Sequence, residues 1–355
     1  MSEYISIERI NSIINITLTR PQVLNALNLD MIRSIYNKIH LWNEDKYILG
    51  VVISGEGEKA FCAGGDIVSI YKSRGDSNLL SKNFFKEEYI LNVAIKNFSK
   101  PWISLLDGVS MGGGLGLAVH GSHRIATENT LAGMPETSIG LFPDVGGGYF
   151  LSRMKGEIGT YLALTGTRLN AEDCIYSGIA NNYILNKDLK RVLIELKTLP
   201  INSDVSQIDK ILKKYNIHYG TSSLEIIENQ VNTNFRFNSI LEIMKSLKKT
   251  NTDWSLKIFD ILSKKSPTSL AITLKQIRLA KNMNFKECMI MEYRMSQGCM
   301  SGNDFYEGVR ANLVDKDHSP KWVPDKIEDV TDNDINNYFK SLKDRDLFYD
   351  AKERI

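Results

Sequence analysis

The residues best suited to chemistry lie in one stretch, 101–153, which holds two carboxylates and two glycine triplets. The carboxylates are Glu136 and Asp144, side chains of the kind that act as nucleophiles or as general acids and bases. The first triplet, Gly112–Gly114, follows an apolar run and opens a segment with the spacing of a short helix. A junction from strand to helix through glycines presents unpaired backbone N–H groups, and no Cβ keeps a ligand away. The stretch therefore predicts a site that holds a negatively charged oxygen.

The elements that must position these residues alternate between strand and helix. Isoleucine-rich runs at 4–10 and 12–19 flank Asn11 and predict a hairpin. The elements predicted next are a helix from Asn28, its N-cap, to Trp42, a strand at 49–53, a helix after Asp66, a helix at 83–97 and a strand at 102–106. This alternation indicates a parallel α/β core in which two loops from strand to helix recur, at Ala63 and at Gly113.

After Arg153 the sequence pattern is mainly helical. Two short helices precede a last strand at 182–185. The segment 187–249 is rich in Lys, Asn and Ser and carries no motif, which favours a solvated helical elaboration. We therefore expect a core over residues 1–198 that carries the site, and a mainly helical C-terminal region over 199–355 that packs on this core.

Composition limits the classes of protein that the chain can represent. Its 355 residues are 43% hydrophobic and carry a net charge of +2, so a large core is expected and no overall field attracts nucleic acid or an anionic membrane. The four cysteines lack metal-ligand or redox spacing, which predicts reduced thiols. Neither a signal or transit peptide nor an apolar run of ~18 residues occurs. We expect a soluble protein, and a cytoplasmic one if its source is bacterial.

Ordered motifs along nearly the whole chain resemble those of the crotonase, or enoyl-CoA hydratase/isomerase, superfamily. They are KAFCAGGDI at 59–67, the triplet Gly112–Gly114, MPETSIGLFPDVGGG from Met134, SPTSLAITLKQ, MEYRMSQ and GNDFYEGVRANLVDKDHSPKW. Within the superfamily the motifs are most similar to those of the 3-hydroxyisobutyryl-CoA hydrolases, and the segment 187–249 is the weakest part of the match. The resemblance implies an α/β fold of the crotonase, ClpP-like kind, a spiral of repeated ββα units with a helical C-terminal region.

The resemblance also assigns roles to backbone groups. In crotonase-like enzymes two N–H groups hold the thioester carbonyl and stabilise the oxyanion that develops on it, and these groups match Ala63 and Gly113 here. The positions that the resemblance places along the CoA part of the substrate are Ala63, Gly64, Gly65, Asp66, Asn25 and Ala26.

Substrate contacts in the hydrolases match Glu88, Gly113, Glu136 and Asp144. Glu136 is expected either to attack the carbonyl, giving a mixed anhydride, or to activate a water, and Asp144 to assist proton movement. The structural alternatives are a helix-capping acid for Glu136, a surface turn for Asp144, and a solvated helix face for Glu88 beside Glu87. The implied reaction converts 3-hydroxyisobutyryl-CoA and water to 3-hydroxyisobutyrate and CoA, a step of valine breakdown. It needs no metal or redox cofactor. Many relatives form homo-oligomers, trimers or pairs of trimers, but the resemblance leaves the oligomeric state of the hydrolases open.

An enoyl-CoA hydratase or isomerase of the same superfamily is the nearest alternative. Its hydratases use two glutamates, one in the helix opened by the glycine triplet and one on the later turn. The later one matches Glu136, but the earlier one falls at Gly116, which has no side chain. One carboxylate cannot readily do the work of two.

Other classes have weaker signals. Gly108 to Gly112 fits the G-x-S-x-G pattern of a serine hydrolase around Ser110, but no downstream histidine has the setting of a triad partner. Cys62 lacks a nearby activating histidine, and His120 and His123 lack further ligands at metal spacing. A binding protein that had lost turnover would be expected to lack the carboxylates, and both are retained.

Overall fold

The computed structural model describes residues 3–75 and 79–348, and the chain divides into two compact units. The sheet unit consists of Met1–Gly65, Ile90–Gly133 and Arg168–Glu225. The helical unit consists of Asp66–Tyr89, Met134–Thr167 and Ile226–Ile355. Each unit is thus built from separate parts of the chain, whereas the sequence suggested two consecutive regions with a boundary at residue 198.

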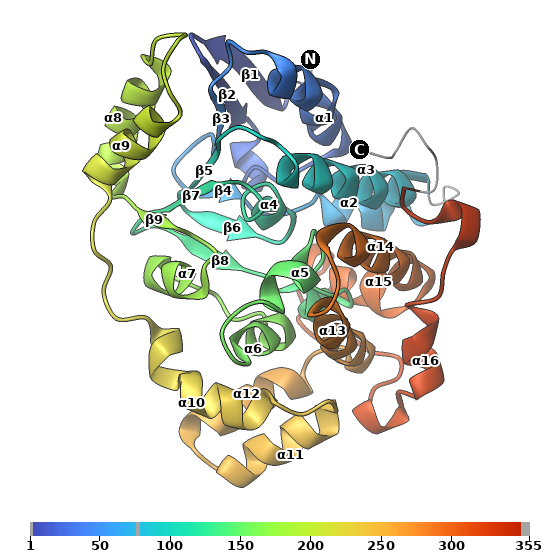
Figure 1. The fold of residues 1–355 in the computed structure, drawn as a ribbon. Helices are drawn as coiled ribbons and strands as arrows, with labels where there is room; N and C mark the ends of the chain where they lie inside the picture. Colours follow the sequence, from blue (N-terminus) through green and yellow to red (C-terminus); the bar gives the residue numbers. More distant parts are fainter. Residues whose placement is uncertain (1–2, 76–78, 349–355) are drawn as a thin grey trace. The chain divides into compact units, whose positions relative to one another are not determined.

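The sheet unit contains two sheets (Figure 1). The larger has the strand order β1-β2-β3-β5-β7-β9, in which β1 and β2 are antiparallel and the other neighbours are parallel. The smaller has the order β4-β6-β8 and is parallel. The strands are β1 Ile5–Ile10, β2 Ile13–Leu18, β3 Gly50–Gly55, β4 Ala60–Cys62, β5 Trp102–Leu106, β6 Val109–Met111, β7 His123–Ala126, β8 Leu131–Gly133 and β9 Asn182–Tyr183.

Successive strands alternate between the two sheets. β3, β5 and β7 lie in the larger sheet, while β4, β6 and β8, each next along the chain, lie in the smaller one. A helical segment follows each pair, namely α2 (Ile67–Lys72), α4 (Gly113–Gly116) and η2 (Glu136–Ile139). The predicted fold of repeated ββα units is therefore confirmed.

The first elements follow directly from local sequence. β1 and β2 form the predicted hairpin, and Asn11 between them has a φ of 52°, a conformation that asparagine tolerates well. Helix α1 (Leu29–Glu44) begins after the predicted N-cap, because the side chain of Asn28 accepts the N–H of Met31 at 2.9 Å.

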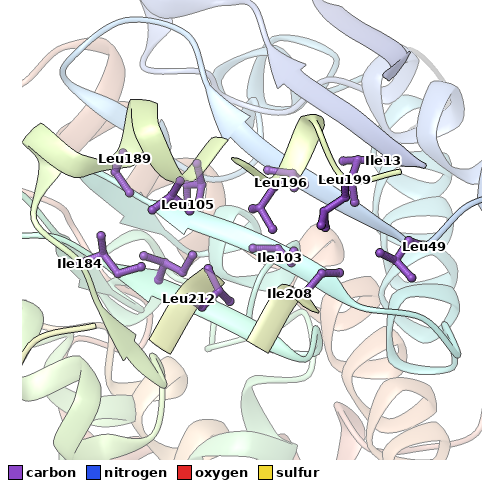
Figure 2. Close-up of a cluster of buried hydrophobic side chains, with 13 residues drawn as sticks. Ile13, Leu49, Ile103, Leu105, Ile184, Leu189, Leu196, Leu199, Ile208 and Leu212 are labelled. Atoms are coloured by element: carbon purple, nitrogen blue, oxygen red, sulfur yellow. The ribbon is translucent and has the colours of Figure 1, made fainter. Parts of the chain in front are cut away.

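Two helices cover one face of the larger sheet (Figure 2). These are α8 (Asn186–Lys197) and α9 (Ser206–Tyr215). Their apolar stripes, with Leu196 and Leu212 among them, are buried against strand residues that include Ile103. This part of the segment 187–249 is helical as predicted, but it forms the core of the sheet unit and is not a solvated elaboration. The remaining helical elements of the sheet unit are η1 (Pro21–Val23) and α7 (Ala171–Ser177).

The helical unit is built around α13 (Pro267–Ala280), which packs against α5 (Gly147–Leu151), α6 (Ile158–Thr165) and α14 (Phe285–Ser301). Ser266 caps α13 by accepting the N–H of Ser269, and Pro267 occupies its first turn, as the sequence predicts. The other helical elements are α11 Ile240–Thr250, α12 Asp253–Ser263, α15 Asp304–Val309, the π-helix Arg310–Val314, η4 Ile327–Asp329, α16 Asp332–Asn337 and η5 Lys343–Arg345. Helices α3 (Leu79–Lys96) and α10 (Ser223–Phe235) have residues in both units.

The four cysteines, Cys62, Cys174, Cys288 and Cys299, are free thiols and all are buried. Burial raises the pKa of the Cys288 thiol to about 12. Within residues 3–75 and 79–348, no helix has the length and apolar character that crossing a membrane requires.

Candidate active site

The first glycine triplet places an unused backbone donor at the start of α4. Gly112 is the N-cap, and its φ of 46° and ψ of −122° suit glycine. Gly113 is the first residue of α4, and its N–H has no acceptor among the described residues. β4 runs close by, because a Cβ on Gly114 would lie 2.3 Å from the carbonyl oxygen of Cys62. The triplet therefore allows a close approach that leaves the Gly113 donor free for a ligand.

The loop after β4 brings a second donor close to Gly113, but it is not the predicted one. The N–H of Ala63 donates to the carbonyl of Leu24 at 2.9 Å, so it is already used inside the protein. The N–H of Gly65, in contrast, has no acceptor in the part of the chain that the structure describes. The loop after β4 passes close to the start of α4 at Gly64, because a Cβ on this residue would lie 3.6 Å from the nitrogen of Gly113. The φ of 105° at Gly64 also requires glycine. The structure thus does not support Ala63 as one of the two donors.

Asn25 and Ala26, predicted to lie along the nucleotide end of CoA, are part of a tight turn. The side chain of Asn25 accepts the N–H of Arg20 at 3.0 Å and donates to the carbonyls of Glu56 and Ala60 at 3.0 and 2.9 Å. The carbonyl of Ala26 accepts from the guanidinium of Arg20 at 2.7 Å. Asn25 also lines a surface hollow of about 330 Å³. Both residues therefore have a structural role, and their contact with CoA stays a prediction.

The helical unit gathers the three predicted carboxylates. Glu88 lies on α3, Glu136 is the first residue of η2, and Asp144 lies in the loop before α5. All three are buried, with exposed fractions of 3%, 6% and 5%. The hydroxyl of Tyr89 donates to Oδ2 of Asp144 at 2.8 Å. The alternatives of a surface turn for Asp144 and a solvated face for Glu88 are therefore excluded.

Burial and mutual repulsion make these carboxyls weak acids. Burial, and then the charges of Asp144 and Glu136, raise the pKa of Glu88 well above its usual range. Burial, followed by the charge of Asp144, does the same for the pKa of Glu136. Burial raises the pKa of Asp144 to about 7, although the bond from Tyr89 opposes the rise. A carboxyl such as that of Asp144, which exchanges its proton near neutral pH, is suited to general acid–base work.

Two of these carboxylates have oxygens without a partner. Oε1 of Glu88 and Oε2 of Glu136 are buried and accept no hydrogen bond from any described residue. Buried polar atoms are nearly always paired, and leaving one unpaired costs about 1–3 kcal/mol. Such oxygens indicate that a substrate or a water completes the site.

Lys265 was not foreseen from the sequence. Burial lowers the pKa of its ammonium to about 8, and the charge of Glu136 opposes that fall. Its Nζ donates to the hydroxyl of Ser138, two residues after Glu136 in η2. Lys265 immediately precedes the N-cap of α13, and no local pattern marks it as different from the exposed Lys264. It supplies positive charge next to Glu136.

Other predicted candidates have structural roles. Asp66 is the N-cap of α2 and accepts the N–H of Ser69 at 3.2 Å. Ser110 is fully buried, and its hydroxyl donates to the carbonyl of Gly108. Cys62 is also fully buried. The described residues contain no group of three or more His, Cys, Asp or Glu that could hold a metal ion.

Comparisons with known proteins agree with this architecture. The chain is similar to the crystal structure of a carnitinyl-CoA dehydratase from Mycobacterium thermoresistibile, with a TM-score of 0.92, 30% identity and coverage of 99% of this chain and 100% of that one. It is similar to an enoyl-CoA hydratase from Rhodobacter sphaeroides 2.4.1, with a TM-score of 0.88, 33% identity and coverage of 97% and 99%. Both are crotonase-fold proteins, so the predicted fold class is confirmed again.

The family follows from the sequence matches. The family described as enoyl-CoA hydratase/isomerase matches residues 13–339, and the chain belongs to it. Relatives named "3-hydroxyisobutyryl-CoA hydrolase, mitochondrial" are 47% identical in Danio rerio and 44% identical in Homo sapiens. These matches cover 94% of this chain and 88% and 87% of the relatives. The predicted similarity to this group of hydrolases, and with it the prediction of an enzyme, is confirmed.

The same names correct one prediction. The relatives are named as mitochondrial proteins, which contradicts the cytoplasmic location expected from the sequence. That expectation was wrong because it rested on the lack of a recognisable targeting signal, and such a lack does not identify a compartment.

Proposed function

We propose that this chain hydrolyses 3-hydroxyisobutyryl-CoA to 3-hydroxyisobutyrate and CoA. The observation that carries the proposal is the group of buried carboxyls in the helical unit, in which Glu136 keeps an unpaired oxygen. The choice of acyl group follows the names of the relatives, which are 44–47% identical over 94% of the chain.

In this proposal the sheet unit binds the thioester oxygen. The N–H groups of Gly65 and Gly113, which have no acceptor among the described residues, would donate to this oxygen as it gains negative charge. Each such donor contributes roughly a hundred- to a thousand-fold in rate. Gly65 takes the role first given to Ala63, because the Ala63 N–H is bound to Leu24. Gly64, Asp66, Asn25 and Ala26 keep their proposed places along CoA.

The helical unit is assigned the proton transfers and the attack. The ionised carboxylate of Glu136 either adds to the carbonyl carbon or takes a proton from the water that adds to it. The C–S bond then breaks, and the CoA thiolate takes up a proton, which Asp144, whose pKa is raised to about 7, would supply. On the first route this leaves a mixed anhydride, and a water then cleaves it to release the acid and restore Glu136. Lys265 would favour the ionised form of Glu136. The reaction so written uses no metal or redox cofactor.

Enoyl-CoA hydration is the second candidate, because two similar solved structures bear the titles of a dehydratase and a hydratase. Gly116, the last residue of α4, argues against hydration, because the hydratases need a glutamate at this position. The higher identity to the hydrolases also favours thioester cleavage.

Two substrates separate these activities. With 3-hydroxyisobutyryl-CoA we expect rapid release of free thiol, and with crotonyl-CoA negligible loss of the enoyl absorbance. Hydration of crotonyl-CoA at a kcat/KM equal to or above that of hydrolysis would overturn the proposal. Faster cleavage of another short hydroxyacyl-CoA would change only the acyl group, because a pocket discriminates one methylene by only ~1–3 kcal/mol.

A further inference from the structure

The loop that carries Asp144 is held by a fourth buried carboxylate, which the proposed mechanism does not use. Glu292 lies on α14 and is fully buried. Its Oε2 accepts the N–H of Gly146 at 2.7 Å, and its Oε1 accepts the N–H of Gly148 at 2.8 Å. The second glycine triplet is therefore bound at both ends by one side chain.

Gln276 on α13 binds the chain on the other side of Asp144. Its Nε2 donates to Oε1 of Glu292 at 3.0 Å and to the carbonyl of Pro143 at 2.8 Å. The residue before Asp144 and the glycines after it are thus fixed to two neighbouring helices.

The turn between these attachments is strained. Val145 has a φ of 50° and Gly146 a φ of 84°, and the N–H of Gly147 closes the turn by donating to the carbonyl of Asp144 at 2.7 Å. A β-branched residue in the left-handed region is an outlier that costs on the order of 1–3 kcal/mol. Such a conformation persists only where its surroundings enforce it, and here the bonds from Gly146 and Gly148 to Glu292 do so.

Both carboxyl oxygens of Glu292 are used as acceptors at this position. Two N–H groups and the Gln276 amide all donate to Glu292, and no cation pairs with it among the described residues. Burial raises the pKa of Glu292 to about 8, while the bonds from Gly146 and Gly148 oppose the rise. A glutamine would offer a single acceptor oxygen and would turn an NH₂ group toward one of the two donors.

We propose that Glu292 is a positioning residue for Asp144: it enforces the strained turn at Val145 and thereby sets the direction in which the Asp144 carboxylate points. Glu292 acts through the backbone and does not touch the substrate. The effect on catalysis rests on the proposed thioester hydrolysis, whereas the hydrogen bonds from Gly146 and Gly148 to Glu292 can be tested without substrate.

The test compares Glu292→Gln with Ser296→Ala. Ser296 is buried on the same helix, and its hydroxyl donates to Tyr293 and not to the turn. In Glu292→Gln, hydrogen exchange of the Gly146 and Gly148 amides is expected to accelerate at least tenfold, and kcat to fall roughly 10- to 100-fold with KM nearly unchanged, because small misplacements of reacting groups have costs of this size. The pH–rate profile should shift as well. Ser296→Ala should change neither exchange nor profile, whatever it does to stability.

A second substitution tests whether Glu292 affects Asp144 through the backbone strain at Val145. Adding Val145→Gly to Glu292→Gln removes the steric cost of positive φ, so part of the lost kcat should return. If Glu292→Gln does not fold, Gln276→Leu takes its place, and a smaller fall in kcat is expected because Pro143 loses its donor. A folded Glu292→Gln variant with wild-type exchange, kcat and pH profile would refute the inference. A wild-type protein without thioesterase activity would refute the proposed function instead. The exchange rates would then still show whether Glu292 fixes the turn at Val145.

Discussion

The two units offer chemistry of different origin. In the sheet unit the candidate groups are the backbone N–H groups of Gly65 and Gly113, which do not titrate and are free because of how the chain is folded. In the helical unit they are the side chains of Glu88, Glu136 and Asp144, whose protonation is set by burial and by one another. The contribution of the sheet unit to the rate should therefore be insensitive to pH and sensitive to backbone geometry, while that of the helical unit should show the reverse.

The largest effect is expected in the helical unit. Glu136→Gln keeps shape but removes the nucleophile or base, so kcat should fall about a thousand-fold or more while CoA-ester binding persists. Steady-state kinetics and calorimetric binding check this, with the exposed Glu242→Gln as the matched change of charge in the same unit. A near wild-type kcat would remove Glu136 from the mechanism.

The next effect tests the sheet unit. Gly113→Pro deletes the proposed donor at the first position of α4, where proline is tolerated and no internal hydrogen bond is lost. Activity should fall roughly 100- to 1000-fold at every pH. Leu29→Pro makes the same change at the first position of α1 and should leave activity intact. Circular dichroism confirms folding of both, and a folded, fully active Gly113→Pro protein would contradict the oxyanion assignment.

A third prediction concerns stability. The folded pKa of Asp144, about 7, lies above the ordinary value of 3.8 for an aspartate, so the folded state retains a proton that the unfolded state has lost. Stability from this group is therefore fully present below about pH 4 and is lost as pH rises through about 7. Asp144→Asn should flatten this slope and raise the free energy of unfolding at pH 8 by on the order of 1–3 kcal/mol, at the expense of activity. Denaturant unfolding at pH 5 and pH 8 measures both; an unchanged slope would show that Asp144 does not titrate in this range.

The smallest effect refines the electrostatics of Glu136. Lys265→Met removes the nearby cation, so the pKa of Glu136 should rise further and the acidic limb of the pH–rate profile should move to higher pH. The rate at pH 6 is expected to fall less than about tenfold. Lys264→Met, at the neighbouring exposed lysine, is the control and should leave the profile in place.

The sequence could predict what depends on short stretches of chain. The hairpin around Asn11, the cap at Asn28 and the strand at 102–106 are local patterns, and all three are found. The family motifs also identified Glu136, Asp144 and Glu88, although only the structure shows that they are buried.

Features that depend on distant contacts could not be predicted in this way. The Ala63 N–H is occupied by Leu24, far back in the sequence, and a motif does not reveal hydrogen bonds of that kind. Lys265 and Glu292 act through residues more than a hundred positions away, which only the tertiary fold brings together. The place of residues 199–225 in the sheet unit depends on packing against strands at the other end of the chain.

The burial of all four thiols has a practical consequence. Hydrolysis of an acyl-CoA is followed by the appearance of free CoA thiol, and reagents that detect it react with exposed thiolates. Because Cys62, Cys174, Cys288 and Cys299 are enclosed, the native protein should add almost no signal of its own to such a measurement. Any slow rise in the absence of substrate would instead report the opening of the fold, so the same reagent records turnover and integrity in one cuvette.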